Sequence, residues 1–243
     1  MATLGELTAG IAHEIKNPLN FVTNFADVSH EMIQEAIHAE SDEERGNILA
    51  DLRINLGKIR EHGHRADGIV RGMMLHARGA AGEMIETDVN ELIETAINLA
   101  YHGMRASHPD RNVRIERTFA PSLPAILLLP PEISRVMLNL LNNALYAASS
   151  ASPRRDQEGV VTVTTAQQDH HVEVRVRDNG PGVPAEIKDK IFQPFFTTKP
   201  AGEGTGLGLS MSYDIVVNGH GGSLTCESNG DGAEFIVQLP VKP

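Results

Sequence analysis

Near the start of the chain, His13 stands beside Glu14 and four positions before Asn17. Apolar residues around this motif recur at three- and four-residue spacing, which predicts the buried stripe of an amphipathic helix with His13 on the opposite side. This stripe consists of Leu4, Leu7, Ile11, Ile15, Leu19 and Val22. A neutral imidazole has one nitrogen free to attack, while a carboxylate can hold the N–H of the other. We therefore interpret His13 as a nucleophile and Glu14 as the group that orients it.

Two other interpretations of His13 are considered. The chain has 11 histidines, and a surface histidine on a helix usually has no chemical role. A zinc-protease helix needs a second histidine where Asn17 stands, so that interpretation is rejected. The choice between a reactive and an idle histidine depends on the rest of the chain.

Asn139 and Asn143 share one face of a predicted helix, because they lie four residues apart. Magnesium takes oxygen ligands and keeps several waters, so one amide oxygen together with phosphate oxygens is enough to hold it. Asn143 is therefore a candidate metal ligand. By itself, the pair also fits the polar face of a surface helix.

Asp178 comes directly after a predicted strand and is followed by Gly180 and Gly182. A carboxylate at a strand end can accept a hydrogen bond from an exocyclic amine such as that of adenine, and glycines let a flat base approach the backbone. This combination indicates a pocket for a nucleotide base, although an ordinary turn has a similar composition.

Three phenylalanines, of which Phe192 is the first, stand in a predicted loop that ends in Thr198 and Lys199. Loops seldom hold so many aromatic residues unless they close over something. Lys199 offers a cation suited to phosphate. We expect this loop to cover a bound ligand.

A glycine-rich run at 202–210 leads into an apolar helix that is predicted to extend to Val217. Free N–H groups and the helix dipole make such a helix start an anion site. The run is not a P-loop, which needs a Gly-Lys-Ser or Gly-Lys-Thr ending, and it lacks the dinucleotide fingerprint. The candidate phosphate-binding residues are Gly204, Thr205, Gly206, Leu207 and Gly208.

Two long helices are expected to position His13. The first is predicted from about Thr3 to Ala39, and the polar segment 40–44 supplies the turn and the acidic start of the second. Apolar and small residues of the second helix form a heptad seam, which is typical of bundle packing. They are Leu49, Leu52, Leu56, Ile59, Gly63, Ala66, Val70, Met73 and Ala77. A two-helix hairpin has too little core to stand alone, so we expect a homodimer with a four-helix bundle; packing on its own chain is the alternative.

The small residues at 79–82 predict a linker, which divides the chain into domains 1–82 and 83–243. The second domain is predicted to be a layer of helices on one face of a mixed, largely antiparallel sheet. The predicted helices are 89–100 and 132–148, and the predicted strands are 113–117, 125–129, 160–165, 172–177, 224–227 and 233–239. The last two strands are joined by a hairpin turn at 229–232.

Composition excludes several classes of protein. The net charge of −11 and the pI near 5.4 argue against a nucleic-acid surface, which is normally basic. The single cysteine, Cys226, excludes an internal disulfide and fits a reducing compartment. The longest apolar run, 125–129, is far shorter than the ~20 residues that span a bilayer, and no signal peptide is recognised, so we expect a cytoplasmic protein. The abrupt helical start suggests a catalytic fragment without its sensory domain.

Taken in order, these motifs resemble those of the sensor histidine kinases of two-component systems, and the resemblance covers nearly all of the chain. It implies a multi-domain α and α+β protein. Residues 1–82 would be the dimerisation and histidine-phosphotransfer hairpin, and residues 83–243 an α/β sandwich of the Bergerat ATP-binding type. It further implies an ATP-dependent protein histidine kinase with ATP and Mg2+ as cofactors and the receiver domain of a response regulator as partner.

The resemblance also assigns roles to individual residues. His13 would accept the phosphoryl group, Glu14 would be the assisting acid or base, and Asn17 would be the amide used to dephosphorylate the partner. The implied metal ligand is Asn143, and Asn139 would support the phosphates. The other implied nucleotide contacts are Asp178, Gly180 and Gly182 at adenine, Phe192, Thr198 and Lys199 in a mobile lid, and Gly204, Thr205, Gly206, Leu207 and Gly208 at the phosphates.

One departure is Tyr146, which stands where many family members carry a basic residue. The main competing reading is a chaperone or DNA-repair ATPase of the same fold, which usually has a glutamate base where this chain has Asn139. A phosphatase-biased relative is left open by Asn17. An inactive scaffold is disfavoured by the intact motifs.

Overall fold

The computed structural model describes residues 4–77, 83–151, 158–200, 204–228 and 230–241. Internal contacts divide the chain into two compact units. The first comprises Met1–Gly79 with Thr197–Thr205, and the second comprises Ala80–Phe196 with Gly206–Pro243. The predicted linker 79–82 lies outside the described residues, so the predicted domain boundary stays a prediction.

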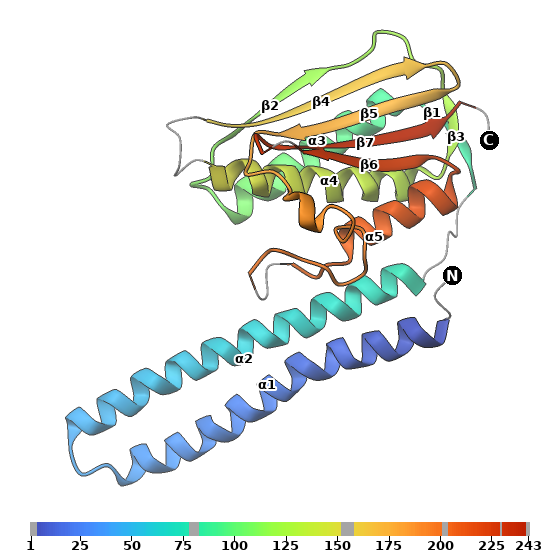
Figure 1. Ribbon diagram of the computed structural model, residues 1–243. Helices are drawn as coiled ribbons and strands as arrows, with labels where there is room; N and C mark the ends of the chain where they lie inside the picture. Colours follow the sequence, from blue (N-terminus) through green and yellow to red (C-terminus); the bar gives the residue numbers. More distant parts are fainter. Residues whose placement is uncertain (1–3, 78–82, 152–157, 201–203, 229, 242–243) are drawn as a thin grey trace. The chain divides into compact units, whose positions relative to one another are not determined.

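The first unit contains two long helices, α1 (Leu4–His38) and α2 (Asp42–Ala77), which form a hairpin (Figure 1). Their lengths agree with the predicted helices and turn. The hydroxyl of Ser41 accepts a hydrogen bond from the N–H of Glu44 at 3.1 Å, which caps the start of α2. Arg45 donates to two carbonyls at the end of α1, both at 3.3 Å. These bonds satisfy backbone groups that helix ends leave open.

The two helices meet along a heptad stripe that differs in part from the predicted one. Buried or half-buried residues at alternating three- and four-residue spacing are Ile15, Pro18, Val22, Phe25, Ser29, Met32 and Ala36 on α1, and Leu52, Asn55, Ile59, His62, Ala66 and Ile69 on α2. Leu19 is 49% exposed, and Leu49 and Leu56 are 51% and 54% exposed, so their predicted burial is wrong within this hairpin. On each helix the buried stripe takes up two positions of the heptad, and Leu19, Leu49 and Leu56 occupy a third position beside it.

The second unit is built on a sheet with the strand order β2-β4-β5-β7-β6. Its strands are β2 (Val113–Thr118), β4 (Gly159–Gln168), β5 (His171–Asp178), β6 (Ser223–Ser228) and β7 (Ala233–Pro240). Only the β2–β4 pair is parallel among the pairs of this sheet, which confirms the prediction of a mixed, largely antiparallel sheet. A separate antiparallel pair joins β1 (Ile85–Thr87) to β3 (Ile126–Leu128). Strand β1 was missed because it is only three residues long and largely exposed.

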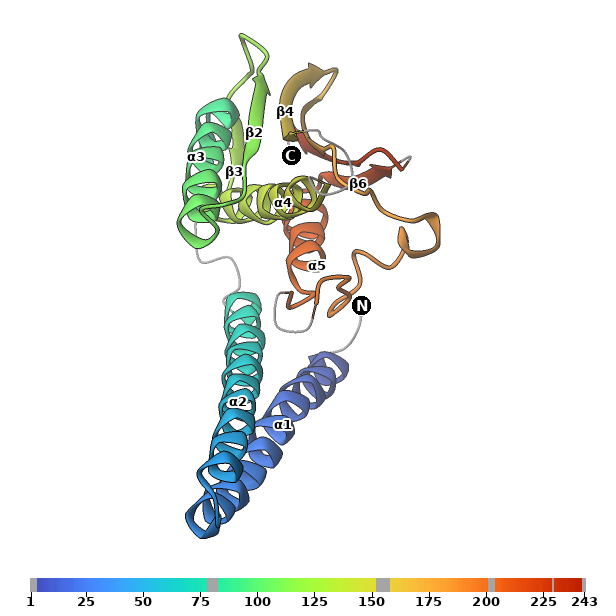
Figure 2. The same cartoon turned by 90° about the vertical axis from the view of Figure 1, so that its left-hand side faces the viewer.

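Helices α3 (Val89–Ser107), α4 (Pro130–Ala151) and α5 (Gly208–Tyr213) cover one face of the sheet (Figures 1 and 2). Ile93 and Ile97 of α3 and Leu140 of α4 are fully buried in the common core. They pack with the face of β5 that carries Val172, Val174 and Val176. One side of helix α4 is therefore buried in the core, so its polar side faces away from the core.

Beyond α5, the predicted continuous helix to Val217 is replaced by a π-helix, Asp214–Gly219. The next residue, His220, is buried and ties this segment to α4. Its Nδ1 donates to the carbonyl of Ile215 at 2.8 Å, and its Nε2 accepts from the N–H of Leu129 at 3.0 Å. These partners assign the neutral tautomer with the proton on Nδ1. A short 3-10 helix, Ala185–Ile187, follows β5. Within the described residues no helix combines the length and hydrophobicity of a membrane span.

Candidate nucleotide and phosphoacceptor sites

Asp178 is the last residue of β5 and is buried, with 3% of its surface exposed. Its Oδ1 accepts hydrogen bonds from the N–H of Gly180 at 2.8 Å and from the N–H of Ala233 at 3.4 Å. Burial raises the pKa of Asp178 to about 6, and the two backbone N–H groups oppose this rise. The carboxylate is therefore a fixed acceptor in an apolar surrounding, at the strand end where the sequence predicted it.

The two glycines after Asp178 allow close approach of the backbone. A Cβ on Gly180 would lie 2.8 Å from the carbonyl oxygen of Ala147 in α4. Gly182 has a φ of +76°, a conformation that L side chains rarely adopt. Both positions therefore require glycine, and the loop after Asp178 lies directly against α4.

Asn139 lies on α4 and binds the start of α5. Its Nδ2 donates to the carbonyl of Gly208 at 3.2 Å and to the hydroxyl of Ser212 at 3.4 Å. This contact joins the helix of the predicted asparagine pair to the glycine-rich segment. The side chain of Asn139 therefore acts as a hydrogen-bond donor here. A base that activates water must instead accept a proton.

Asn143 lies one turn further along α4 and is half-buried. Tyr146 follows it by three residues, and the guanidinium carbon of Arg111 lies 5.4 Å from the centre of the Tyr146 ring. Arg111 comes from the segment before β2, so no local sequence pattern predicts a cation beside Tyr146. Among the described residues, no group of three or more histidine, cysteine or acidic side chains forms a metal cluster.

The phenylalanine loop is anchored to the second unit at its start. Phe192 and Phe196 are half-buried and pack on the core, and the ring of Phe192 lies 5.5 Å from that of Tyr213. Phe195 has a φ of +67°, and a Cβ on Gly206 would collide with its backbone. Gly206 itself has a φ of +68°, whereas a Cβ on Gly208 would make an ordinary contact of 3.6 Å with Asn139.

By its internal contacts, the segment Thr197–Thr205 is assigned to the first unit. Thr198 and Thr205 are exposed, and Lys199 and Gly204 are half-buried. A Cβ on Gly204 would meet the side chains of Thr197 and Lys199. The predicted lid thus has one part anchored in the second unit and one part assigned to the first.

The predicted phosphoacceptor motif lies on α1. The side chains of His13 and Glu14 lie outside the described residues, so their predicted geometry stays a prediction. Asn17 is half-buried and Pro18 is buried inside α1. Because proline has no N–H, it cannot bond the carbonyl of Glu14 four residues earlier, and the helical ladder is interrupted directly after His13.

Sequence reasoning missed Ala233 and Ser228, which contact the site from the β6–β7 turn. Ala233 donates its N–H to Asp178, and the hydroxyl of Ser228 accepts the N–H of Val183 at 2.8 Å. Both act on a loop that lies 45 residues or more earlier in the chain. No local pattern in the sequence signals such contacts.

Comparisons with known proteins agree with this arrangement. The family model described as "Histidine kinase-, DNA gyrase B-, and HSP90-like ATPase" matches residues 129–243. The two-component sensor PprA of Pseudomonas aeruginosa is 32% identical over 241 residues, which are 99% of this chain and 25% of PprA. The chain spans between a quarter and a half of the length of the curated relatives that it matches first.

Two solved structures of the histidine kinase ThkA are similar to this chain. Its catalytic domain is 32% identical, with a TM-score of 0.57, and the match covers 66% of this chain and 97% of that one. ThkA in complex with the response regulator protein TrrA is 27% identical, with a TM-score of 0.66, and the match covers 98% of this chain and 62% of that one. The second match includes the helical hairpin.

Proposed function

Since this chain belongs to the sensor histidine kinase family, as a helical hairpin followed by an ATP-binding domain, we propose that it is an ATP-dependent protein histidine kinase. The proposed reaction transfers the γ-phosphoryl group of ATP to the imidazole of His13. The phosphoryl group then passes to an aspartate of a response regulator.

The observation that carries this proposal is the buried carboxylate of Asp178. Its Oδ1 accepts hydrogen bonds from two backbone N–H groups, which hold the carboxylate in place. A carboxylate fixed in this way offers an acceptor to a donor such as the exocyclic amine of adenine. The backbone beside it is open to a flat base because Gly180 and Gly182 carry no side chain.

The phosphates of ATP would lie between α4 and the start of α5. The backbone N–H groups of Gly206, Leu207 and Gly208 would bind them, with Lys199 and Thr198 added by the lid and Gly204 and Thr205 completing the run. Asn143 would hold Mg2+, which supplies charge neutralisation at the transferred phosphoryl group. Phe192 would anchor the lid.

The transfer step requires only positioning by this chain. One nitrogen of His13 attacks the γ-phosphorus, the bond to the β–γ bridging oxygen breaks, and ADP leaves with that electron pair. The proton on the other nitrogen of His13 is held by Glu14, which orients the ring and assists its release. Phosphohistidine is the product, and its P–N bond is the one that breaks in transfer to a response regulator.

The position of Asn139 favours a kinase over a hydrolytic ATPase of the same fold. Its amide group cannot take a proton from water, and its Nδ2 donates to Gly208 and Ser212. A chaperone or repair ATPase would need a carboxylate there. A phosphatase-biased kinase is the second candidate, because Asn17 offers an amide one turn after His13.

The proposed partners are a second copy of the chain and a response regulator. Leu19, Leu49 and Leu56 lie exposed beside the buried stripe of the hairpin, and a four-helix bundle would cover them. ThkA, which is similar over 98% of this chain, is known in complex with a response regulator protein. A sensory domain outside this sequence and a cytoplasmic location are also proposed.

The test is incubation with ATP labelled at the γ-phosphate, beside a His13→Ala variant. The expected result is label on the unmodified protein and none on His13→Ala, and the label should be lost in acid and kept in alkali. A matched control is His30→Ala, a histidine on the same helix that should keep the label. Labelling of the His13→Ala variant would contradict the assignment. ATP binding without any labelling would favour the phosphatase-biased alternative.

A further inference from the structure

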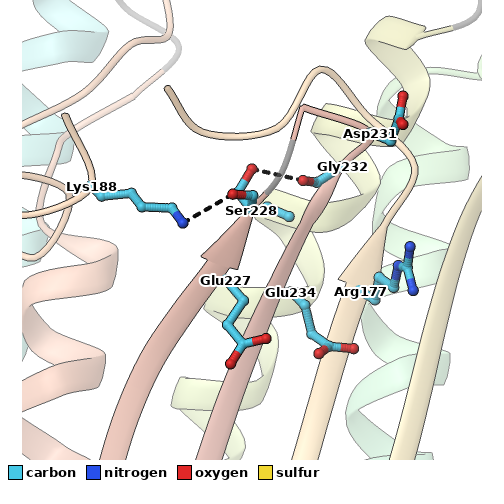
Figure 3. A pocket seen from close by; sticks show the side chains of 8 residues that line it. Arg177, Lys188, Glu227, Ser228, Asp231, Gly232 and Glu234 are labelled. Carbon is cyan, nitrogen blue, oxygen red and sulfur yellow. Dashed lines mark hydrogen bonds between the residues drawn. The ribbon is translucent and has the colours of Figure 1, made fainter. Parts of the chain in front are cut away.

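Ser228 ends β6, and its hydroxyl joins two segments that flank Asp178. The hydroxyl accepts a hydrogen bond from the N–H of Val183 at 2.8 Å and donates one to the carbonyl of Gly232 at 2.8 Å. Val183 follows the loop that begins at Asp178, and Gly232 is the last residue before β7. Figure 3 shows the bond from Ser228 to Gly232 at the edge of a pocket. We call these two hydrogen bonds the Ser228 brace.

Two glycines show that the braced segments pack closely. A Cβ on Gly182 would lie 2.6 Å from the hydroxyl oxygen of Ser228. Gly232 has a φ of +115°, and a Cβ there would collide with the carbonyl oxygen of Asp178. The loop 178–183 and the β6–β7 turn are therefore in backbone contact, and the Ser228 brace holds them at that distance.

Lys188 fixes the strand end from the other side. Its Nζ donates to the carbonyl of Ser228 at 3.0 Å, as Figure 3 also shows. Lys188, Ser228 and Gly232 line a pocket of about 290 Å³ together with Arg177, Glu227 and Asp231. The backbone of Ser228 is thus held by Lys188, while its hydroxyl holds the loop.

The loop between Asp178 and Val183 is held at both ends. At its start, Asn179 donates its N–H to the carbonyl of Val160 at 3.1 Å, and its Oδ1 accepts the N–H of Val160 at 2.8 Å. At its end, the backbone N–H of Val183 is held by the hydroxyl of Ser228. Gly180 and Gly182 lie between these two anchors, and glycine gives the backbone the most freedom to depart from one conformation.

We propose that Ser228 is a positioning residue for nucleotide binding, whose hydroxyl keeps the loop 178–183 in the conformation that receives the base. The proposal rests on the proposed ATP-binding function. Preorganisation of a binding loop raises affinity because less conformational entropy is lost when the ligand binds. Removal of the hydroxyl should therefore weaken ATP binding without changing the transfer step, since it touches neither α1 nor the glycine-rich run.

The test compares Ser228→Ala with Ser223→Ala in the full chain. Ser223 lies at the other end of the same strand, and its hydroxyl donates to Oε1 of Gln238 at 2.9 Å. Both variants lose one half-buried hydroxyl from β6. Mg-ATP affinity would be measured by calorimetry, and the autophosphorylation rate would be measured against ATP concentration.

For Ser228→Ala we expect the Kd and the apparent KM for ATP to rise about fivefold, with an unchanged maximal rate, which corresponds to about 1 kcal/mol. Ser223→Ala should leave all three values unchanged. An equal loss in both variants, or no loss in Ser228→Ala, would overturn the proposal while the ATP-binding function stands. If the unmodified chain bound no ATP, the proposed function would fail as well.

Lys188→Met is a second variant that leaves the hydroxyl in place. It removes the bond to the carbonyl of Ser228 and should raise the KM for ATP less than Ser228→Ala does, by about twofold. An effect larger than that of Ser228→Ala would assign the positioning to the lysine and overturn the role of the hydroxyl.

Discussion

The N–H of Gly180 donates a hydrogen bond of 2.8 Å to Oδ1 of Asp178. The carboxylate is therefore oriented by the loop that follows it. The N–H of Ala233 approaches the same oxygen from the neighbouring strand. A side chain held in this way has lost most of its rotational freedom before a nucleotide arrives. Substitutions of Asp178 that keep Oδ1 therefore test the acceptor without changing the backbone around it.

Asp178→Asn should abolish measurable ATP binding and stabilise the fold. The amide keeps Oδ1 but presents N–H groups where adenine would need an acceptor. A pKa of about 6 against the ordinary 3.8 means that the buried charge destabilises the folded state above pH 6. The upper limit is roughly 3 kcal/mol, since one pKa unit is about 1.4 kcal/mol. Urea unfolding at pH 8 should give a rise of about 1–3 kcal/mol. A less stable variant would contradict the assigned cause.

The ATP affinity of the unmodified chain should fall below pH 6. Binding requires the ionised carboxylate of Asp178 as an acceptor. The ionised fraction falls about tenfold for each pH unit below the pKa. The contribution of Asp178 to the free energy of unfolding changes with pH in the opposite direction to the ATP affinity. Because the folded-state pKa is raised, that contribution is fully present below the unfolded value of 3.8 and is lost as the pH rises through about 6. Calorimetry from about pH 5 to about pH 7 measures the affinity. A constant affinity across this range would sink the prediction.

Gly206→Ala should lower ATP affinity by about tenfold or more, whereas Gly208→Ala should change it less than about threefold. Gly206 has a positive φ and no room for a Cβ beside the backbone of Phe195. Gly208 starts α5, and its Cβ would make only an ordinary contact with Asn139. Calorimetry with Mg-ATP checks both variants. Equal effects would mean that the conformation of Gly206 is not what the site requires.

His220→Ala should reduce the free energy of unfolding by about 2–4 kcal/mol. The substitution leaves the buried N–H of Leu129 and the carbonyl of Ile215 without the imidazole that bonds them. His170→Ala removes an exposed histidine in the β4–β5 turn and should change the value by less than about 0.5 kcal/mol. Guanidinium unfolding measures both variants, and similar values for the two would contradict the structural role.

Leu56→Asp should convert a dimer into a monomer without unfolding the hairpin. Leu56 is 54% exposed in the single chain, so its substitution removes little internal packing, but a charge in a bundle core is costly. Lys58→Glu changes charge on the opposite side of α2 and should leave the dimer intact. Light scattering coupled to size-exclusion chromatography gives the mass. A dimeric Leu56→Asp protein would show that another surface joins the copies.

Local signals predicted most of the fold. Pro130 and Pro131 mark the start of α4, the alternate valines of 172–176 mark the buried face of β5, and the polar segment 40–44 separates α1 from α2. The exposure of Leu49 and Leu56 was not predicted, because spacing gives a period but not the neighbour that covers each position. The π-helix was missed for a similar reason, since its apolar residues have the same spacing as a continued α-helix.

Longer-range packing also explains Glu173, which alternates with the buried valines of β5 and would be expected on the opposite face of the sheet. It is only 3% exposed, because Arg175 and the side chain of Gln238 in β7 close over it. Burial opposes ionisation, yet hydrogen bonds from Arg175 and Gln238 hold the pKa of Glu173 below its ordinary value. In the candidate site, Asp178 and its glycines were found from the sequence. Ser228 and His220 were not, because each bonds backbone far away in the chain.

The pairing of β5 with β7 bears on the order in which a growing chain folds. The contact of Asp178 with Ala233 spans 55 residues. Strand β5, which ends in Asp178, therefore gains its second neighbour only when β7 has left the ribosome. The contacts between α1 and α2 are complete long before, since local pairs form earlier than distant ones. During synthesis the predicted phosphoacceptor helix is thus in place before the predicted ATP site is complete, and a chain that lacks β7 should not phosphorylate itself.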